Sequence, residues 1–239
     1  MKSVRAVLFD FNGVLLDDES YHWRAFREVL GPLGVGLSRA RYNARYLVFD
    51  DKSALAAMLR DAGLRGVSLP NLLRRKRRVY RGLARRLRID PRAARLVRDV
   101  ARRVPIAVVS GAARSEVRGA LRRAGLTGQF GAIVTAEDVK RPKPWPDGYR
   151  LALRRLGLRN GRGCVAIEDS PGGVRAAQAA NLVVVGVATT FSPAALRRAG
   201  ATRVVSSLGL LDADGLAGAG SIDVREPSAS RRRLRRRRS

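Results

Sequence analysis

The chain has 239 residues, of which 46% are hydrophobic and 28% charged, so it can bury a sizeable core as one large or two modest domains. Its one cysteine, Cys164, excludes an internal disulfide, and its one histidine, His22, excludes a metal site built from several histidines. The formal net charge of +28 is extreme, but the basic residues are dispersed along the chain, so the charge indicates little about a reaction.

The first predicted element is a buried strand over residues 4–9, which ends at Asp10 and is followed by a turn at Gly13. Residues 18–88 then predict almost only helix. Glycine and proline signals divide this block into helices at 21–30, 38–48, 53–62 and 70–87. Because the block follows a single strand, we interpret it as a second domain inserted into the first.

From residue 89 onward, strands alternate with helices. The predicted strands are 106–109, 132–135, 164–167 and 182–187, and the helices between and around them are 91–103, 113–124, 147–156, 171–180 and 193–199. This alternation predicts an α/β fold with a parallel sheet covered on both faces. We therefore expect a core at 1–17 and 89–211, a helical insert at 18–88 and a disordered arginine-rich tail at 212–239.

Polar side chains follow several of the predicted strands, at the edge where parallel α/β sheets bind ligands. Three carboxylates gathered there would repel one another, and a divalent cation such as Mg²⁺, which prefers oxygen ligands, would relieve the repulsion. A hydroxyl and an ammonium suit a phosphoryl group, and a carboxylate beside it can attack phosphorus to form an aspartyl phosphate. The side chains at this edge are Asp10, Asn12, Ser110, Lys143, Glu168 and Asp169.

These residues stand in motifs that resemble those of the haloacid dehalogenase (HAD) superfamily. The motifs are Asp10–Val14, Val109–Gly111, Lys143-Pro144 and Ile167–Ser170. The stretch from Glu168 to Val174 and the helical insert resemble the β-phosphoglucomutase-like and phosphatase branch. The resemblance implies a Rossmann-like, doubly wound parallel sheet with an inserted α-helical cap domain.

The resemblance also implies a role for each matching residue. Asp10 would be the nucleophile and a Mg²⁺ ligand, and Asn12 would lend its backbone carbonyl to the metal. Ser110 and Lys143 would hold the transferring phosphoryl group. The remaining metal ligands would be Glu168 and Asp169.

Asn12 is a departure from the family pattern. The family's phosphatases and mutases carry a second aspartate there, which protonates the leaving oxygen and later activates water. An amide does neither at neutral pH, and such acid–base catalysis is typically worth about 10²–10⁴-fold. The metal site is expected to be intact, while the turnover rate is in question.

The expected substrate-binding residues are Gly13, His22, Lys52, Lys76 and Gly111. His22 has the spacing of a cap histidine in the mutase branch, and Lys76 with Tyr80 matches a cap-helix pattern of that branch. Lys52 lies in the cap loop that faces the active site in that branch. The competing interpretation is that these cap side chains belong to ordinary solvated surface.

We expect a cytoplasmic, Mg²⁺-dependent phosphohydrolase that acts on a small phosphorylated metabolite through an aspartyl phosphate at Asp10. No apolar stretch is long enough to span a membrane, and a monomer or weak dimer is expected. Three alternatives remain open. They are a phosphosugar mutase, a phosphonatase-like C–P hydrolase that uses Lys52, and a weakly active HAD protein that binds phosphorylated ligands or, nonspecifically, nucleic acid.

Overall fold

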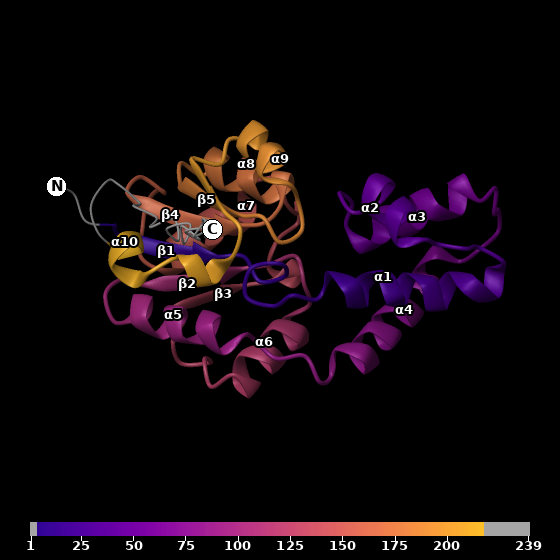
Figure 1. The fold of residues 1–239 in the computed structure, drawn as a ribbon, viewed down its shortest axis with the longest axis horizontal. Helices are drawn as coiled ribbons and strands as arrows, with labels where there is room; N and C mark the ends of the chain where they lie inside the picture. Colours follow the sequence, from indigo (N-terminus) through magenta and orange to yellow (C-terminus); the bar gives the residue numbers. More distant parts are fainter. Residues whose placement is uncertain (1–3, 218–239) are drawn as a thin grey trace, which may run out of the picture.

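The computed structural model describes residues 4–217 and divides into an α/β core and a helical cap (Figure 1). Within this part of the chain, six parallel strands form one sheet in the order β3-β2-β1-β4-β5-β6. The strands are β1 (Ala6–Phe9), β2 (Ile106–Val109), β3 (Ala132–Val134), β4 (Cys164–Glu168), β5 (Val183–Val187) and β6 (Arg203–Val205). The order reverses between β1 and β4, as in doubly wound sheets, and confirms the predicted fold class.

Helices cover both faces of the sheet, and every strand residue of β1, β2 and β4 is therefore buried. One face packs against α5 (Pro91–Ala101), α6 (Arg114–Arg123) and α10 (Ala213–Ala217). The other face packs against α7 (Asp147–Arg155), α8 (Pro171–Ala179) and α9 (Pro193–Ala199). The short 3₁₀ helices are Gly31–Leu33, Ala136–Asp138 and Leu208–Leu210.

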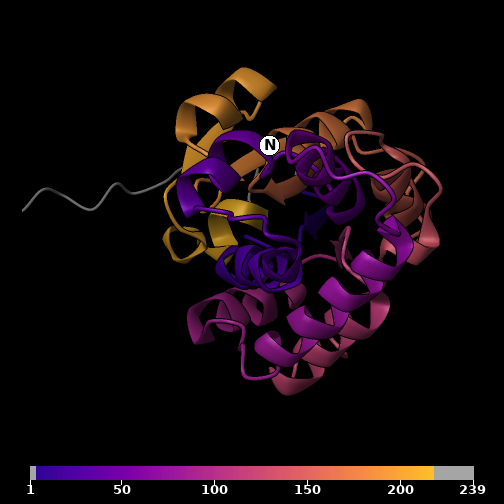
Figure 2. The ribbon, with the colours of Figure 1, turned by 90° about the vertical axis from the view of Figure 1, so that its right-hand side faces the viewer.

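The cap consists of α1 (Glu19–Leu30), α2 (Arg39–Arg45), α3 (Asp51–Asp61) and α4 (Leu69–Ala84). It has its own apolar core, in which Phe26, Leu55 and Met58 are almost completely buried. Because β1 leads directly into α1, the cap lies beyond the carboxyl ends of the strands, as the two views show (Figures 1 and 2). The edge that carries the polar side chains therefore faces the cap.

The pairing register of β1 aligns the ends of the central strands. Phe9 is paired with Val108 on one side and with Ile167 on the other. The residues that follow, Asp10 and Glu168, consequently emerge at the same level, on either side of the point where the strand order reverses. In doubly wound sheets this is where ligands bind.

Two parts of the fold differ from the sequence prediction. The strand β6 was not predicted, because its three residues are too few to show a periodic pattern. The predicted disordered tail, 212–239, is wrong at its start, since Ala213–Ala217 form α10 and Leu216 is fully buried against the core. The rest of that tail, including the arginine run at 231–238, lies outside the described residues. Among the residues that are described, no helix has both the length and the apolar character required to cross a bilayer.

Candidate active site

Three acidic side chains meet at the carboxyl ends of β1 and β4. Asp10 is 7% exposed, Glu168 is fully buried and Asp169 is 5% exposed. One carboxylate oxygen from each lies within 4.8 Å of the others. Burying three like charges together is costly unless a cation is near them. The three acids thus come together at this edge of the sheet, as the sequence predicts.

Lys143 supplies a positive charge at this centre. Its Nζ lies 2.8 Å from Asp10 Oδ1 and 2.6 Å from Glu168 Oε1, and it donates a hydrogen bond to the Val109 carbonyl at 3.0 Å. The buried Tyr149 hydroxyl, which the sequence analysis missed, donates to Glu168 Oε1 at 2.7 Å. Both contacts orient Glu168, but a single ammonium cannot neutralise three carboxylates.

The carboxyl pKa values reflect this imbalance. Burial and the neighbouring Glu168 raise the pKa of Asp10 to about 7, although Lys143 opposes the shift. Burial, Asp10 and Glu168 raise the pKa of Asp169 well above its usual range. Burial alone would lower the pKa of Lys143, but the two carboxylates beside it raise the value above normal. The centre thus has the electrostatics of a site that attracts a further cation.

Two glycines make room for the carboxylates. Gly13 has a φ of +74°, and a Cβ there would lie 1.8 Å from Asp169 Oδ2. In α8, a Cβ on Gly173 would lie 2.0 Å from the Glu168 carboxylate. Any larger residue at either position would displace a carboxylate. The cradle of closely spaced, buried oxygen donors fits a hard divalent cation such as Mg²⁺.

Ser110 and Asn12 lie beside this centre. Ser110 is 5% exposed, and its hydroxyl donates to Asn12 Oδ1 at 3.3 Å. The backbone N–H of Ala112 donates to the same hydroxyl at 3.0 Å, which orients it. Gly111, by contrast, is exposed and has no neighbouring atom within 4 Å of where its Cβ would be.

The cap contributes a second polar cluster, in which Lys76 is fully buried. Its Nζ lies 2.6 Å from His22 Nδ1 and 2.5 Å from Asp51 Oδ1. His22 Nε2 lies 3.3 Å from Asp18 Oδ2, and Tyr80 donates a hydrogen bond to the same oxygen. The interpretation of Lys76 as part of a solvated helix face is therefore wrong.

In this cluster two carboxylates face Lys76 and His22, and the 2.6 Å contact between Lys76 and His22 opposes protonation of the imidazole. Burial and Lys76 lower the pKa of His22, but Asp18 and Asp51 outweigh them and raise it to about 9. Burial would raise the pKa of Asp18 and Asp51, and in both cases the hydrogen bond from His22 reverses the shift and lowers it. At neutral pH the cluster therefore pairs cations with two carboxylates.

Lys52 is not part of this cluster. It is exposed at the first turn of α3, where its backbone N–H donates to Asp50 Oδ1 at 2.9 Å. The carboxylate of its neighbour Asp51 forms an ion pair with Lys76. Sequence reasoning missed Asp18 and Asp51. Asp18 could have been found from its spacing, since it lies four residues before His22 and thus one helical turn away.

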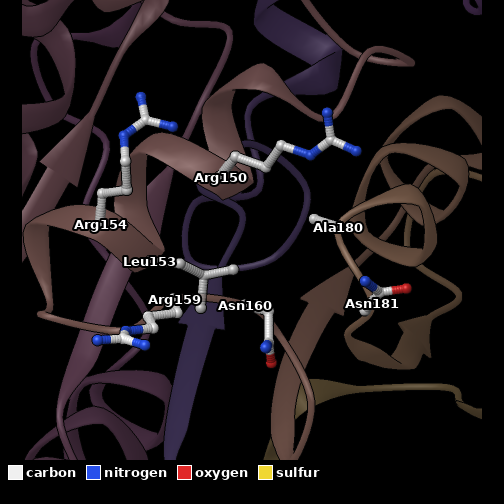
Figure 3. A pocket seen from close by; sticks show the side chains of 7 residues that line it. All are labelled: Arg150, Leu153, Arg154, Arg159, Asn160, Ala180 and Asn181. Carbon is white, nitrogen blue, oxygen red and sulfur yellow. The ribbon is translucent and has the colours of Figure 1, made fainter.

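A separate cavity of about 220 Å³ lies between the ends of α7 and α8 (Figure 3). It is next to the amino ends of β4 and β5, opposite the acidic centre. Figure 3 shows the guanidinium groups of Arg150, Arg154 and Arg159 well separated from one another. They do not converge on a common point as an anion site requires, so this cavity is not part of the candidate active site.

Comparisons with known proteins agree with this geometry. A model of the haloacid dehalogenase-like hydrolase family matches residues 4–181. CbbY from Cereibacter sphaeroides is 32% identical over 236 residues, which cover 95% of this chain and 100% of that protein. Fructose-1-phosphate phosphatase YqaB from Escherichia coli is 30% identical over 188 residues, covering 76% and 95%. The chloroplastic SUPPRESSOR OF QUENCHING 1 of Arabidopsis thaliana is 31% identical, but the chain spans only 22% of its length.

A solved structure shares the same architecture. The crystal structure of CbbY from Rhodobacter sphaeroides in complex with phosphate matches with a TM-score of 0.74 and 29% identity, over 86% of this chain and 95% of that one. The family model covers most of the chain, and the bacterial CbbY match extends over nearly all of it. We conclude that the chain belongs to the haloacid dehalogenase-like hydrolases, a family in which several of its relatives are named phosphatases.

Proposed function

We propose that the protein is a Mg²⁺-dependent phosphatase of a small phosphorylated sugar and that it acts through an aspartyl phosphate at Asp10. The observation that carries the proposal is the contact of Asp10 with Lys143 inside the buried acidic centre. It brings a carboxylate nucleophile and a phosphate-binding ammonium to one point.

The chain's own residues supply most of the chemistry. Asp10 attacks phosphorus, the bond from phosphorus to the sugar oxygen breaks with its electron pair on that oxygen, and the sugar leaves as an alcohol after the oxygen takes a proton from water. Water then attacks the aspartyl phosphate, which releases inorganic phosphate and regenerates Asp10. Lys143 and Ser110 bind the phosphoryl oxygens in both steps, because an ammonium and a hydroxyl can donate to the charge on them.

The metal ligands would be Asp10, Glu168, Asp169 and the backbone carbonyl of Asn12. Bound Mg²⁺ would neutralise the carboxylates and the phosphoryl charge. The Asn12 side chain can orient a water molecule or a leaving oxygen, but it has no acidic proton to give. We therefore expect faster cleavage of esters whose leaving groups need no proton.

The proposed substrate class is inferred from the names of the relatives. The names of two of them, from Escherichia coli and Thermotoga maritima, specify fructose 1-phosphate and phosphorylated carbohydrates. A structure of Rhodobacter sphaeroides CbbY is described as a complex with xylulose 1,5-bisphosphate. These names support a sugar phosphate as the substrate of this chain.

Two alternatives are weaker. A phosphosugar mutase would be consistent with the placement of His22 and Lys76 in the cap, but it needs an acid–base group that Asn12 does not supply. A C–P hydrolase would need a lysine at the reaction centre, and within residues 4–217 no contact joins Lys52 to the acidic cluster.

The test is phosphate release from a panel of sugar mono- and bisphosphates and one aryl phosphate, with Mg²⁺ and with EDTA. The proposal predicts Mg²⁺-dependent release that Asp10→Asn abolishes. Equal release by Asp10→Asn, or release that EDTA does not affect, would contradict it.

A further inference from the structure

Asp18 is a fully buried carboxylate at the junction between the active-site loop and the cap. Its Oδ2 receives Asn12 Nδ2 at 2.5 Å and the Tyr80 hydroxyl, and it lies 3.3 Å from His22 Nε2. Its other oxygen, Oδ1, is also buried and has no hydrogen-bond partner among the described residues. One oxygen of Asp18 therefore joins the active-site loop to helices α1 and α4.

The contact with Asp18 determines which way the Asn12 amide faces. An ionised carboxylate only accepts hydrogen bonds, so the amide nitrogen of Asn12 has to be the atom that faces it. The Asn12 carbonyl oxygen then faces the other way, where the Ser110 hydroxyl donates to it at 3.3 Å. Both ends of the amide are thus fixed, one by the cap junction and one by the phosphate-binding serine.

We propose that Asp18 is a positioning residue that forms a matched pair with Asn12, so that the amide oxygen of Asn12 faces the phosphoryl site. The inference rests on the proposed phosphatase function and adds to it a reason for the residue at position 12. With Asp18 as partner, residue 12 has to be a donor on the cap side. An amide meets that requirement, and a carboxylate does not.

The matched pair makes a specific prediction about exchanging the two groups. Asn12→Asp alone would place two carboxylates at hydrogen-bond distance with no donor between them, which is repulsive. Asn12→Asp combined with Asp18→Asn restores the hydrogen bond with its direction reversed, because the amide nitrogen introduced at position 18 would donate to the carboxylate introduced at position 12. The Tyr80 hydroxyl would then have to accept instead of donate, and His22 would lose its carboxylate contact at this atom. The double variant also gives position 12 a carboxylate able to act in acid–base catalysis.

The experiment measures kcat and KM for wild type, the two single variants and the double variant. The substrates are an aryl phosphate, whose leaving group needs no proton, and a sugar phosphate, whose leaving group does. Asp17→Asn is the matched control, because Asp17 is the exposed neighbour of Asp18. Melting temperatures of all five proteins report on the pair independently of activity.

We expect Asp18→Asn to lower kcat by about 10-fold with little change in KM, because an amide at position 18 can present either its oxygen or its nitrogen to Asn12 and no longer requires the Asn12 nitrogen to face it. The double variant should exceed wild type by about 10-fold or more on the sugar phosphate, with a smaller gain on the aryl phosphate. Asn12→Asp alone should show a smaller increase in kcat on the sugar phosphate than the double variant. Each single variant should melt about 4 °C or more below wild type, and the double variant should recover part of that loss, since it restores the contact between positions 12 and 18 but not that of His22 with a carboxylate. Asp17→Asn should match wild type in every measurement.

Two results would overturn the pairing. One is an Asn12→Asp variant that equals or exceeds the double variant on the sugar phosphate. The other is a double variant whose loss of melting temperature relative to wild type equals or exceeds the sum of the losses in the two single variants. If none of the five proteins releases phosphate from either ester, the proposed function fails. The melting temperatures then still decide the pairing, because recovery in the double variant supports it and additive losses contradict it.

Discussion

The Lys143 ammonium lies 2.8 Å from the Asp10 carboxylate, inside a centre that also buries Glu168 and Asp169. The same ammonium is 2.6 Å from Glu168, so two acids share it. This sharing explains why the pKa of Lys143 is raised despite its burial. Under the proposed function, a bound phosphoryl group would take over one of the contacts of Lys143.

Lys143→Ala should therefore lower phosphate release by about 10²–10³-fold, the usual cost of losing one buried donor to a charged transition state. Lys140→Ala is the control, because Lys140 is an exposed lysine in the same loop region. Steady-state rates with saturating Mg²⁺ check the prediction. A Lys143→Ala enzyme within threefold of the Lys140→Ala enzyme would contradict the role of Lys143.

Mg²⁺ should stabilise the folded protein even without substrate, since an ion that binds only the native state raises the melting temperature with its concentration. Asp169→Asn removes one of the three clustered carboxylates and should reduce this shift. Thermal melts across a Mg²⁺ titration measure it, with Asp99→Asn as the control, because Asp99 on α5 pairs with Arg102 and is not among the clustered carboxylates. If Mg²⁺ raised the melting temperature of the Asp169→Asn protein as much as that of wild type, Asp169 would not be a metal ligand.

The glycine pair in α8 offers a matched test of the carboxylate cradle. Gly173→Ala would bring a Cβ to 2.0 Å from the Glu168 carboxylate, so it should displace Glu168 and lower both stability and activity. The Cβ that Gly172→Ala introduces would have no neighbouring atom within 4 Å. This substitution should be neutral or stabilise the helix by about 0.5–1 kcal/mol. Similar unfolding free energies for the two variants would show that Glu168 is not held against Gly173.

His22 should make stability depend on pH. Its folded pKa of about 9 lies above the usual 6.5, so its stabilising contribution is complete below pH 6.5 and is lost as pH rises through 9. The difference in unfolding free energy between wild type and His22→Gln should be greatest near pH 6, up to about 3 kcal/mol, and should shrink toward pH 10. Denaturant titrations at several pH values measure the difference. A gap that stays constant or widens with pH would contradict the paired, protonated state of His22.

The fold and the acidic centre could be predicted from sequence because their signals are local. Asp10, Ser110 and Glu168 each end or follow an apolar strand, and parallel pairing alone brings such ends together. The short strand β6 and the buried start of the predicted tail gave no such signal. Three residues show no periodicity, and the burial of Leu216 depends on a tertiary contact with the core.

The second polar cluster, which surrounds Lys76 and His22 in the cap, was harder to predict because it depends on the packing of three helices. Lys76 lies in an arginine-rich helix whose sequence predicts a solvated face, and only the arrangement of α1, α3 and α4 shows that it is buried. Asp51 and Lys76 are 25 residues apart, and no local rule pairs them. The contact between Asn12 and Asp18 crosses a turn of irregular backbone, where sequence spacing does not determine which side chains meet.

The most direct test of the account is to identify the residue that carries the phosphoryl group during turnover. The protein is mixed with Mg²⁺ and an aryl phosphate, quenched in acid and analysed by mass spectrometry of its peptides, with and without hydroxylamine, which cleaves acyl phosphates. We predict one hydroxylamine-sensitive phosphoryl group on Asp10, absent from Asp10→Asn. A phosphoryl group on any other residue, or full turnover with no phosphorylated protein at any time point, would contradict the account.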